Sequence, residues 1–343
     1  MRRLALLLFA SVVTAFAQDV SRMDEAVQVQ AKDHVFMGAV LVARDGTVIF
    51  ETACGLANAE WEVPNAPDTR FRVGSVTKQF TAAAFLRLAE QGKLSLDDPA
   101  SRFVEGMPAA WAGITLRHLL SHTSGIPEFS KLPDYADRRR GPLELGKSLA
   151  RLYEFPLESA PGEKFSYSNS GYILLSHILE RVTGRTFGDH LREEFFAPLG
   201  LTDTAVDSNG AIVPRRAAGY FRPQGKLTNA PFINMDVPMG AGALRSTVRD
   251  LWRWTDALMG GQVLSAASLA EMTTPGLGDY GLGLVIKESQ GRRIIEHGGS
   301  IEGFTAHLRY YPETRVTIVV LANVNSPAPP KLADALGAIA HGG

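Results

Sequence analysis

Strand-like segments at both ends of the chain constrain its fold more than any other feature. Near the start, two aliphatic segments, residues 38–43 and 47–50, flank Asp45-Gly46, a dipeptide typical of two-residue hairpin turns. Near the end, four more short segments alternate with turns, at residues 281–286, 292–296, 304–311 and 316–321, and a turn is expected over 298–303. Because strands joined by short turns pair antiparallel, we expect both groups to form one antiparallel sheet.

The middle of the chain has a helical pattern instead. Between Leu94 and Met235, short runs with helical spacing are broken by proline and glycine, at residues 100–104, 116–121, 145–155, 172–182 and 187–196. Further helices are expected at 20–33, 79–91, 248–258 and 331–339. The sequence therefore predicts an α/β (α+β) fold with a discontinuous sheet-containing domain (18–93 and 236–343) and a mainly helical domain (94–235). A cleft between two such domains is a preferred place for a small-molecule site.

The first 17 residues have the three parts of a secretory signal peptide. Met1-Arg2-Arg3 is basic, the run from Leu4 to Phe16 is apolar, and Ala15-Phe16-Ala17 has the small-x-small pattern of a cleavage site. We therefore expect cleavage after Ala17, which leaves 326 of the 343 residues. This leader predicts a secreted or periplasmic protein with no membrane anchor after cleavage.

Charge and cysteine content exclude several classes of function. There are 35 Lys and Arg residues and 36 Asp and Glu residues, a formal net charge of −1, and loss of the two leader arginines makes it −3. This balance gives no footprint for nucleic acid. The single cysteine, Cys54, allows no internal disulfide. No His, Cys, Asp or Glu grouping has the spacing of metal ligands, so we expect no metal and no cofactor. The sequence leaves the oligomeric state open.

Ser75 and Lys78 are the first candidate catalytic residues. They are three residues apart at the predicted start of the helix over 79–91, so both would lie on one helix face. Ser75 is open to two interpretations, since serine is also a preferred N-cap and Lys78 would then be a solvated side chain. In the catalytic interpretation, Ser75 is a nucleophile and the amine of Lys78 takes up its proton.

Two later clusters bear on this choice. The first is a polar loop over 161–172, in which Tyr167 and Asn169 are a phenol and an amide two residues apart. The loop is either a simple polar turn, or its phenol exchanges a proton with Ser75 while the amide orients Lys78 or a substrate carbonyl.

The second cluster is Glu296-His297-Gly298-Gly299-Ser300, which is expected to close a strand. The glycines would let the backbone approach a ligand closely. The backbone N–H of Ser300 could then form an oxyanion hole together with the N–H of Ser75.

Taken together, these clusters resemble the penicillin-recognising serine hydrolase superfamily, in its branch of class C β-lactamases, D-alanyl-D-alanine carboxypeptidases, D-aminopeptidases and esterases. The motifs of that family, S-x-x-K, then Y-x-N, then K- or H-x-G, occur in order as Ser75–Lys78, Tyr167–Asn169 and His297–Gly299. The resemblance extends to residues 71–74, 119–127, 240–246 and the final strands, and so covers most of the mature chain.

The resemblance implies a β-lactamase/transpeptidase-like fold, with an antiparallel sheet flanked by helices and the site at the domain junction. It implies that Ser75 attacks a carbonyl and that Lys78 and Tyr167 share the role of base, as a coupled unit. Asn169, His297, Gly299 and Ser300 would orient or bind the substrate. The backbone N–H groups of Ser75 and Ser300 would hold the oxyanion.

Two further residues receive provisional roles. Tyr220, which follows Gly219 in the long loop before residue 240, is a candidate for lining the acyl pocket. His122, in Ser121-His122-Thr123-Ser124-Gly125, could pair with a serine, but we interpret it as a loop residue that satisfies local backbone groups.

At His297-Gly298 the sequence departs from the family pattern, and this departure bears on which substrates the site can accept. Members that process carboxylates commonly carry Lys-Thr there, whereas histidine is mostly neutral near pH 7 and glycine has no side chain. We therefore expect a secreted serine hydrolase that cleaves amide or ester bonds of D-amino-acid peptides or small esters. A class C-like β-lactamase and a non-catalytic cell-wall binding protein are the alternatives. Hydrolysis and acyl transfer are both open.

Overall fold

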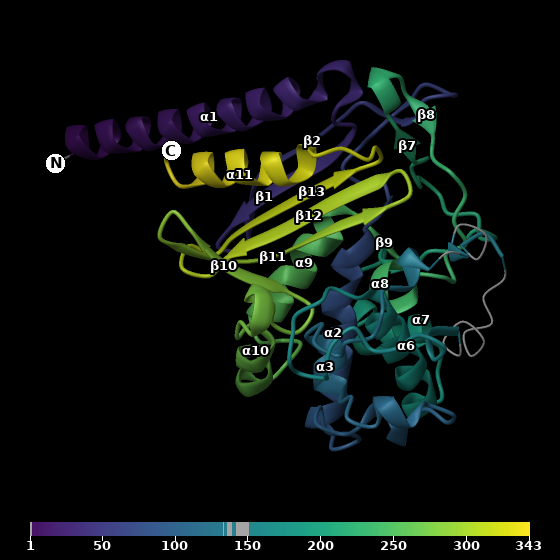
Figure 1. Cartoon of the computed structure of the whole chain (residues 1–343). Coiled ribbons are helices and arrows are strands. Elements are labelled where there is room, and N and C mark those ends of the chain that lie inside the picture. The colour runs from purple at the N-terminus through teal and green to yellow at the C-terminus, as the bar shows by residue number, and fades with distance from the viewer. Residues whose placement is uncertain (1, 133, 136–138, 142–150) are drawn as a thin grey trace.

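A six-stranded antiparallel sheet built from both ends of the chain is the centre of the fold (Figure 1). The computed structural model describes residues 2–132, 134–135, 139–141 and 151–343. The strand order is β10-β11-β12-β13-β1-β2, so the N-terminal hairpin joins the C-terminal strands through β1 and β13. The six strands are β1 Gly38–Arg44, β2 Thr47–Cys54, β10 Val285–Ser289, β11 Arg292–Ile301, β12 Phe304–Tyr311 and β13 Val316–Ala322.

Helices cover both faces of this sheet. In Figure 1, α1 and α11 lie on one side, and α2, α9 and α10 lie on the other. The α-helices described are α1 Arg2–Ala31, α2 Thr77–Glu90, α3 Leu116–Leu120, α6 Asn169–Thr183, α7 Phe187–Leu191, α8 Met239–Gly242, α9 Val248–Met259, α10 Ala266–Met272 and α11 Ala328–Ala340. Short strands add smaller sheets: β3 Leu56–Asn58, β4 Val63–Pro64, β5 Phe71–Arg72, β6 Ala205–Val206, β7 Tyr220–Phe221, β8 Thr228–Asn229 and β9 Leu244–Ser246.

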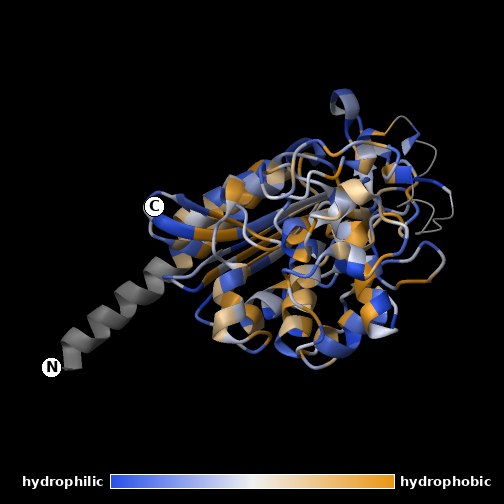
Figure 2. Cartoon of the chain, turned by 60° about the horizontal axis from the view of Figure 1, so that its bottom comes forward, coloured by the Kyte–Doolittle hydropathy of each residue, from blue (hydrophilic) through white to orange (hydrophobic). Residues whose placement is uncertain are grey.

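The alternation of side chains along each strand supplies both hydrophobic cores. On β1, Leu41 packs toward α2 and α9, while Val40 and Val42 pack toward α1 and α11. Every residue of β13 is buried for the same reason, since both of its faces are covered. Figure 2 shows apolar residues along the strands and on the helices beside them.

Helix α2 runs through the core and carries the first candidate residues. It begins two residues earlier than predicted, at Thr77, after a 3₁₀ turn over Gly74–Val76. It ends as the sequence indicated, with Gly92 at φ +67° and the Lys93 N–H bonded to the Leu88 carbonyl at 3.0 Å.

Some element boundaries differ from those predicted. The first helix is longer, Arg2–Ala31, and α6 begins three residues early, at Asn169. Strand β10 is Val285–Ser289 rather than 281–286. The helix predicted over 145–155 falls largely on residues 142–150, which lie outside the described residues. Within the part of the chain that the structure describes, no helix is both long and apolar enough to cross a bilayer.

The turn predicted over 298–303 is wrong, and the difference affects the site. Strand β11 continues through both glycines to Ile301, and only Glu302 and Gly303 form the turn. A Cβ built on Gly299 would lie 2.0 Å from the Val73 carbonyl oxygen. These glycines therefore mark a strand that passes very close to another backbone, and they do not end it.

Candidate active site

Ser75 lies in the 3₁₀ turn before α2, where a glycine allows two backbones to meet. Gly74 has φ +52°, and a Cβ built on it would lie 2.8 Å from the Ser300 nitrogen. Val76, and not Ser75, occupies the N-cap position of α2. The Ser75 Oγ instead accepts a hydrogen bond from the Lys78 Nζ at 3.0 Å. The structure therefore does not support the helix-cap interpretation of Ser75.

Lys78 is completely buried beside Ser75. Besides Ser75 Oγ, its Nζ contacts the Asn169 Oδ1 at 2.7 Å and the Ala241 carbonyl oxygen at 2.8 Å. Burial lowers the pKa of Lys78 from 10.5 to about 7, and the nearby negative charge of Glu128 partly opposes this shift. Near pH 7 a large fraction of this amine is therefore neutral.

The three contacts of the Lys78 Nζ suit both charge states of the amine. Two N–H groups can be donated to the oxygens of Asn169 and Ala241, which only accept. In the charged amine the third N–H is donated to the Ser75 Oγ, and in the neutral amine the lone pair faces that hydroxyl and can accept its hydrogen. This is the arrangement that a general base requires.

Tyr167 lies on the other side of the Ser75–Lys78 pair. Its phenol hydrogen-bonds with Ser75, and the Lys78 Nζ lies 4.8 Å from the centre of its ring. Desolvation raises the pKa of Tyr167 above its usual value of 10, although 37% of the residue is exposed, which limits this effect. The phenol is therefore protonated at neutral pH, which favours Lys78 over Tyr167 as the resting base.

Asn169 is the first residue of α6, and a buried carboxylate holds it there. Glu128 accepts hydrogen bonds from the Asn169 backbone N–H at 2.5 Å and from its Nδ2 at 3.2 Å. Sequence reasoning missed Glu128, although it directly follows the Ser-His-Thr-Ser-Gly-Ile-Pro stretch. It also missed Ala241, whose contribution is a carbonyl oxygen and therefore leaves no side-chain signal.

The candidate oxyanion hole lies between Ser75 and strand β11. Pairing with β10 involves only Arg292–Glu296 of β11, so the β10-facing edge is open beyond that point. Ile301 pairs with Phe304 across the turn, so its N–H points toward β12. Because the direction of the N–H alternates along an antiparallel strand, the N–H of Ser300 points the other way, to the open edge. A Cβ on Gly299 would lie 3.1 Å from the Ser75 nitrogen. The structure thus brings the backbones of Ser75 and Ser300 together.

His297 is close to the site but does not line the cavity. Its Nδ1 lies 2.5 Å from the Gly298 carbonyl oxygen and therefore donates, so its Nε2 accepts from the Tyr280 hydroxyl at 2.9 Å. Burial first, and then the Lys78 charge, lower the pKa of His297 to about 3. The imidazole is thus neutral with both nitrogens occupied, so it supports Tyr280 and does not offer a contact to substrate.

His122 packs against the ring of Tyr167, with the ring centres 4.2 Å apart. Its Nδ1 accepts from the Ser168 backbone N–H at 3.1 Å, and burial holds the pKa of the imidazole well below 6.5. This agrees with the interpretation of His122 as a loop residue that satisfies local backbone groups.

Tyr220 does not lie in the cavity, so the prediction that it lines the acyl pocket is wrong. It is 2% exposed in the core between the sheet and α1/α11, and its hydroxyl accepts from the Ala59 N–H at 2.7 Å. The next residue, Phe221, lines the cavity instead. Neighbouring residues on an extended segment point to opposite sides, so a one-residue error reverses the assignment.

This placement gives a test of Tyr220. The change Tyr220→Phe is expected to lower the free energy of unfolding by about 0.5–1.5 kcal/mol, because the hydrogen bond to Ala59 is lost. Its kcat and KM should match those of the wild type. The change Phe221→Ala, in the cavity wall, should raise KM instead; denaturant unfolding and steady-state kinetics of the two variants would show whether the roles are reversed.

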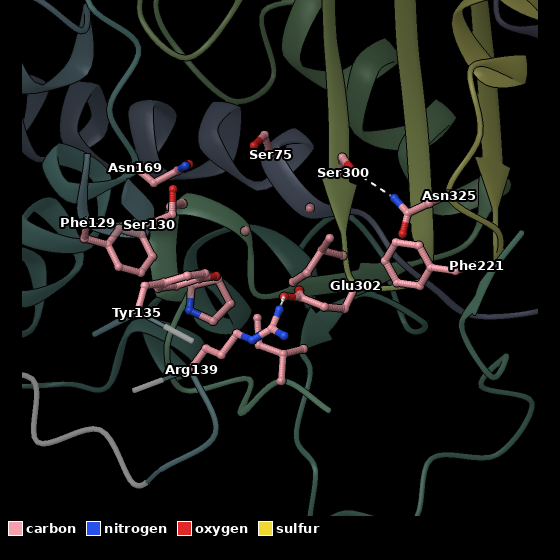
Figure 3. Close-up of a pocket in the computed structure, with 16 residues that line it drawn as sticks. Ser75, Phe129, Ser130, Tyr135, Arg139, Asn169, Phe221, Ser300, Glu302 and Asn325 are labelled. Carbon is pink, nitrogen blue, oxygen red and sulfur yellow. Dashed lines mark hydrogen bonds and ion pairs between the residues drawn. The ribbon is translucent and has the colours of Figure 1, made fainter. Parts of the chain in front are cut away.

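A cavity of about 350 Å³ opens over Ser75 (Figure 3). Ser75, Asn169 and Ser300 lie along one side, and Arg139 and Glu302 form an ion pair of 2.8 Å on the opposite side. Asn325 donates to the Ser300 Oγ at 3.0 Å. The apolar wall comes from Phe129, Tyr135, Phe221, Ile233 and Pro238. Over the described residues, no group of three or more His, Cys, Asp or Glu side chains is placed to hold a metal ion.

Comparisons with known proteins agree with this fold. The family model described as Beta-lactamase matches residues 23–342. Penicillin-binding protein 4* of Bacillus subtilis is 28% identical over 84% of this chain and 68% of its own length. Protein flp of Staphylococcus aureus is 27% identical over 89% of this chain, which spans only 63% of that protein. The solved D-amino acid amidase of Ochrobactrum anthropi SV3 superposes with a TM-score of 0.82 and 25% identity, over 93% of this chain and 99% of the amidase.

These findings identify a β-lactamase-related serine hydrolase with a β-lactamase/transpeptidase-like fold. The chain belongs to the Beta-lactamase family. The expected membership of the penicillin-recognising serine hydrolase superfamily is thereby confirmed.

Proposed function

We propose that this protein cleaves amide or ester bonds of D-amino-acid peptides, D-amino-acid amides or small esters through an acyl-enzyme on Ser75. The single observation that carries the proposal is the buried Lys78 amine, whose Nζ lies 3.0 Å from the Ser75 Oγ. The similarity to a D-amino acid amidase supports the choice of substrate class. The proposed location is the periplasm or the exterior, after removal of residues 1–17.

In the proposed reaction, the Ser75 oxygen attacks the carbonyl carbon as its proton passes to the neutral Lys78 amine. The backbone N–H groups of Ser75 and Ser300 stabilise the negative charge that develops on the carbonyl oxygen. Tyr167, protonated and hydrogen-bonded to Ser75, is placed to pass a proton to the leaving group. Water then attacks the acyl-enzyme with the same groups acting in reverse.

The alternatives are less well supported by the site. A β-lactamase would need a partner for the substrate carboxylate near His297-Gly298, where His297 is neutral and occupied by Tyr280 and Gly298 has no side chain. A non-catalytic binding protein would have no use for a lysine amine that burial holds close to its titration point.

A substrate panel on the purified protein separates these activities. We expect turnover of a p-nitrophenyl ester and of D-amino-acid amides or D-Ala-D-Ala peptides, with nitrocefin turned over at least about 100-fold more slowly, as expected when a buried charge lacks its partner. Faster turnover of nitrocefin than of every amide and ester would establish the β-lactamase alternative. Turnover of none by a folded protein would favour the binding protein.

The pH dependence of kcat/KM should follow the titration of Lys78. Because its neutral form is the base, kcat/KM is expected to rise with pH through a midpoint near 7 and then level off. The pKa of Tyr167 is raised, so loss of its proton should produce no fall below pH 10. A rate that declines as the pH rises from 6 to 8 would contradict Lys78 as the base.

A further inference from the structure

Glu128 is a buried carboxylate next to the site, 7% exposed, in the loop between α3 and the 3₁₀ turn Phe129–Lys131. Its Oε2 accepts from the Asn169 N–H at 2.5 Å, and its Oε1 accepts from the Asn169 Nδ2 and the Ser130 N–H, each at 3.2 Å. Three N–H donors from two separate segments therefore converge on one carboxylate. This arrangement clamps the start of α6 against the wall of the cavity.

The carboxylate also determines which way the Asn169 amide points. An ionised carboxylate only accepts hydrogen bonds, so the Asn169 Nδ2 must face Glu128. The Asn169 Oδ1 must then face Lys78, whose Nζ lies 2.7 Å away. With the amide reversed, two donors would face each other at Lys78 and the carboxylate would face an oxygen.

Glu128 also brings a negative charge to bear on Lys78. Among the residues that the structure describes, the other titratable groups around Lys78 are His122 from the α3 loop, Tyr167 and Tyr172 from the α6 segment, and His297 from β11. The two imidazoles have strongly lowered pKa values and the two phenols have raised ones, so all four are neutral at pH 7. The carboxylate therefore opposes the desolvation of the amine without contacting it.

We propose that Glu128 is a positioning residue of the site, which fixes the Asn169 amide with its oxygen toward Lys78 and holds a negative charge on the far side of that amide from the amine. This inference deepens the proposed function, on which its catalytic meaning rests. Its physical content, a coupling between Glu128 and Lys78, exists in the free protein and can be measured without turnover.

The test is an NMR titration of the lysine side chains in the free, full-length protein labelled with ¹³C at Cε. The chain has nine lysines, and the Lys78 resonance is identified by its loss in Lys78→Met. In Glu128→Gln, the Lys78 midpoint is expected to fall by about one pH unit or more, because an opposite charge separated from the amine by only the Asn169 amide is removed. In Glu128→Asp, the carboxylate is kept but lies one methylene group farther back. The fall in the Lys78 midpoint should therefore be less than half as large.

A purely structural role would leave the Lys78 midpoint unchanged in Glu128→Gln, and this result would overturn the proposal. If Glu128→Gln does not fold, Glu128→Asp decides alone: a small downward shift supports the proposal, and an unchanged or raised midpoint overturns it.

A second readout connects the coupling to catalysis. The rate constant for phosphonylation of Ser75 by a fluorophosphonate at pH 8, with fluoride as the leaving group, is expected to drop about 10-fold or more in Glu128→Gln, because a misdirected Asn169 misplaces the amine. The acid limb of the pH–rate profile of Glu128→Gln should move to lower pH together with the NMR midpoint of Lys78. If the wild type is not phosphonylated at all, the proposed function fails, while the NMR shift still decides the coupling.

Discussion

Replacing Lys78 by methionine is expected to reduce the rate of acylation about 10²–10⁴-fold, the range that loss of a general base produces. Methionine keeps the length and burial of the side chain but cannot accept the Ser75 proton. The loss of rate should persist from pH 6 to pH 9. Methionine has no proton that titrates, so raising the pH cannot generate a base at position 78. Single-turnover acylation by a p-nitrophenyl ester measures this directly.

The same substitution should change the pH dependence of stability. In the folded protein the pKa of Lys78 is about 7, against 10.5 for an unperturbed lysine. Between these pH values Lys78 is protonated in the unfolded chain and neutral in the folded protein, so its contribution makes the wild-type stability rise with pH from about 7 to 10.5. Below pH 7, the full cost of burying the charged amine lowers the stability of the folded protein. The advantage of Lys78→Met over the wild type should therefore shrink by about 2–5 kcal/mol between pH 6 and pH 10.

Urea unfolding of the two proteins at several pH values measures this difference. A difference that does not depend on pH would mean that the amine is charged in the folded state, which would contradict the assignment of Lys78 as a neutral base.

Adding one methyl group at Gly299 is expected to reduce kcat about 10²–10³-fold, the usual cost of losing an oxyanion-hole donor. The new Cβ would lie 2.0 Å from the Val73 carbonyl oxygen and 3.1 Å from the Ser75 nitrogen. Strand β11 must therefore move away from the turn that holds Ser75. This movement separates the N–H groups of Ser75 and Ser300, and it should also lower the Tm.

The adjacent glycine provides a matched control. A Cβ on Gly298 would have the His307 Nδ1 as its nearest neighbour at 3.6 Å, which is an ordinary contact. Gly298→Ala should therefore retain most of the kcat. If steady-state kinetics with one ester showed equal losses in the two variants, the close approach at Gly299 would not be what maintains the oxyanion hole.

Much of the fold could be predicted because its signals are local or repeated. Asp45-Gly46 and the aliphatic runs indicated the strands, and the order of Ser75, Tyr167 and His297 in the sequence identified the family. The spacing of Ser75 and Lys78 also predicted that their side chains meet. The structure has Ser75 in the turn before α2 and Lys78 in its first turn, with the Ser75 Oγ and Lys78 Nζ 3.0 Å apart. Signals of this kind depend on neighbours in the sequence, not on the final packing.

The features that were missed depend on contacts between distant segments. Strand β11 continues through Gly298 and Gly299 because both pair with β12, and only a glycine at 299 fits beside Val73. Nothing near residue 299 in the sequence shows either contact. His297 turns to Tyr280, and Tyr220 turns into the core, because of partners 17 and 161 residues away. In the sequence, Glu128 has no feature that distinguishes it from other acidic loop residues. Its role depends on α6, which places Asn169 against it.

The most direct test of the central claim is intact-mass spectrometry of the protein after incubation with a fluorophosphonate, followed by peptide mapping. We expect one adduct per chain, located on Ser75, formed faster at pH 8 than at pH 6, and absent from Ser75→Ala. An adduct that survives in Ser75→Ala, or no adduct on a folded wild-type protein, would contradict the assignment of Ser75 as the nucleophile.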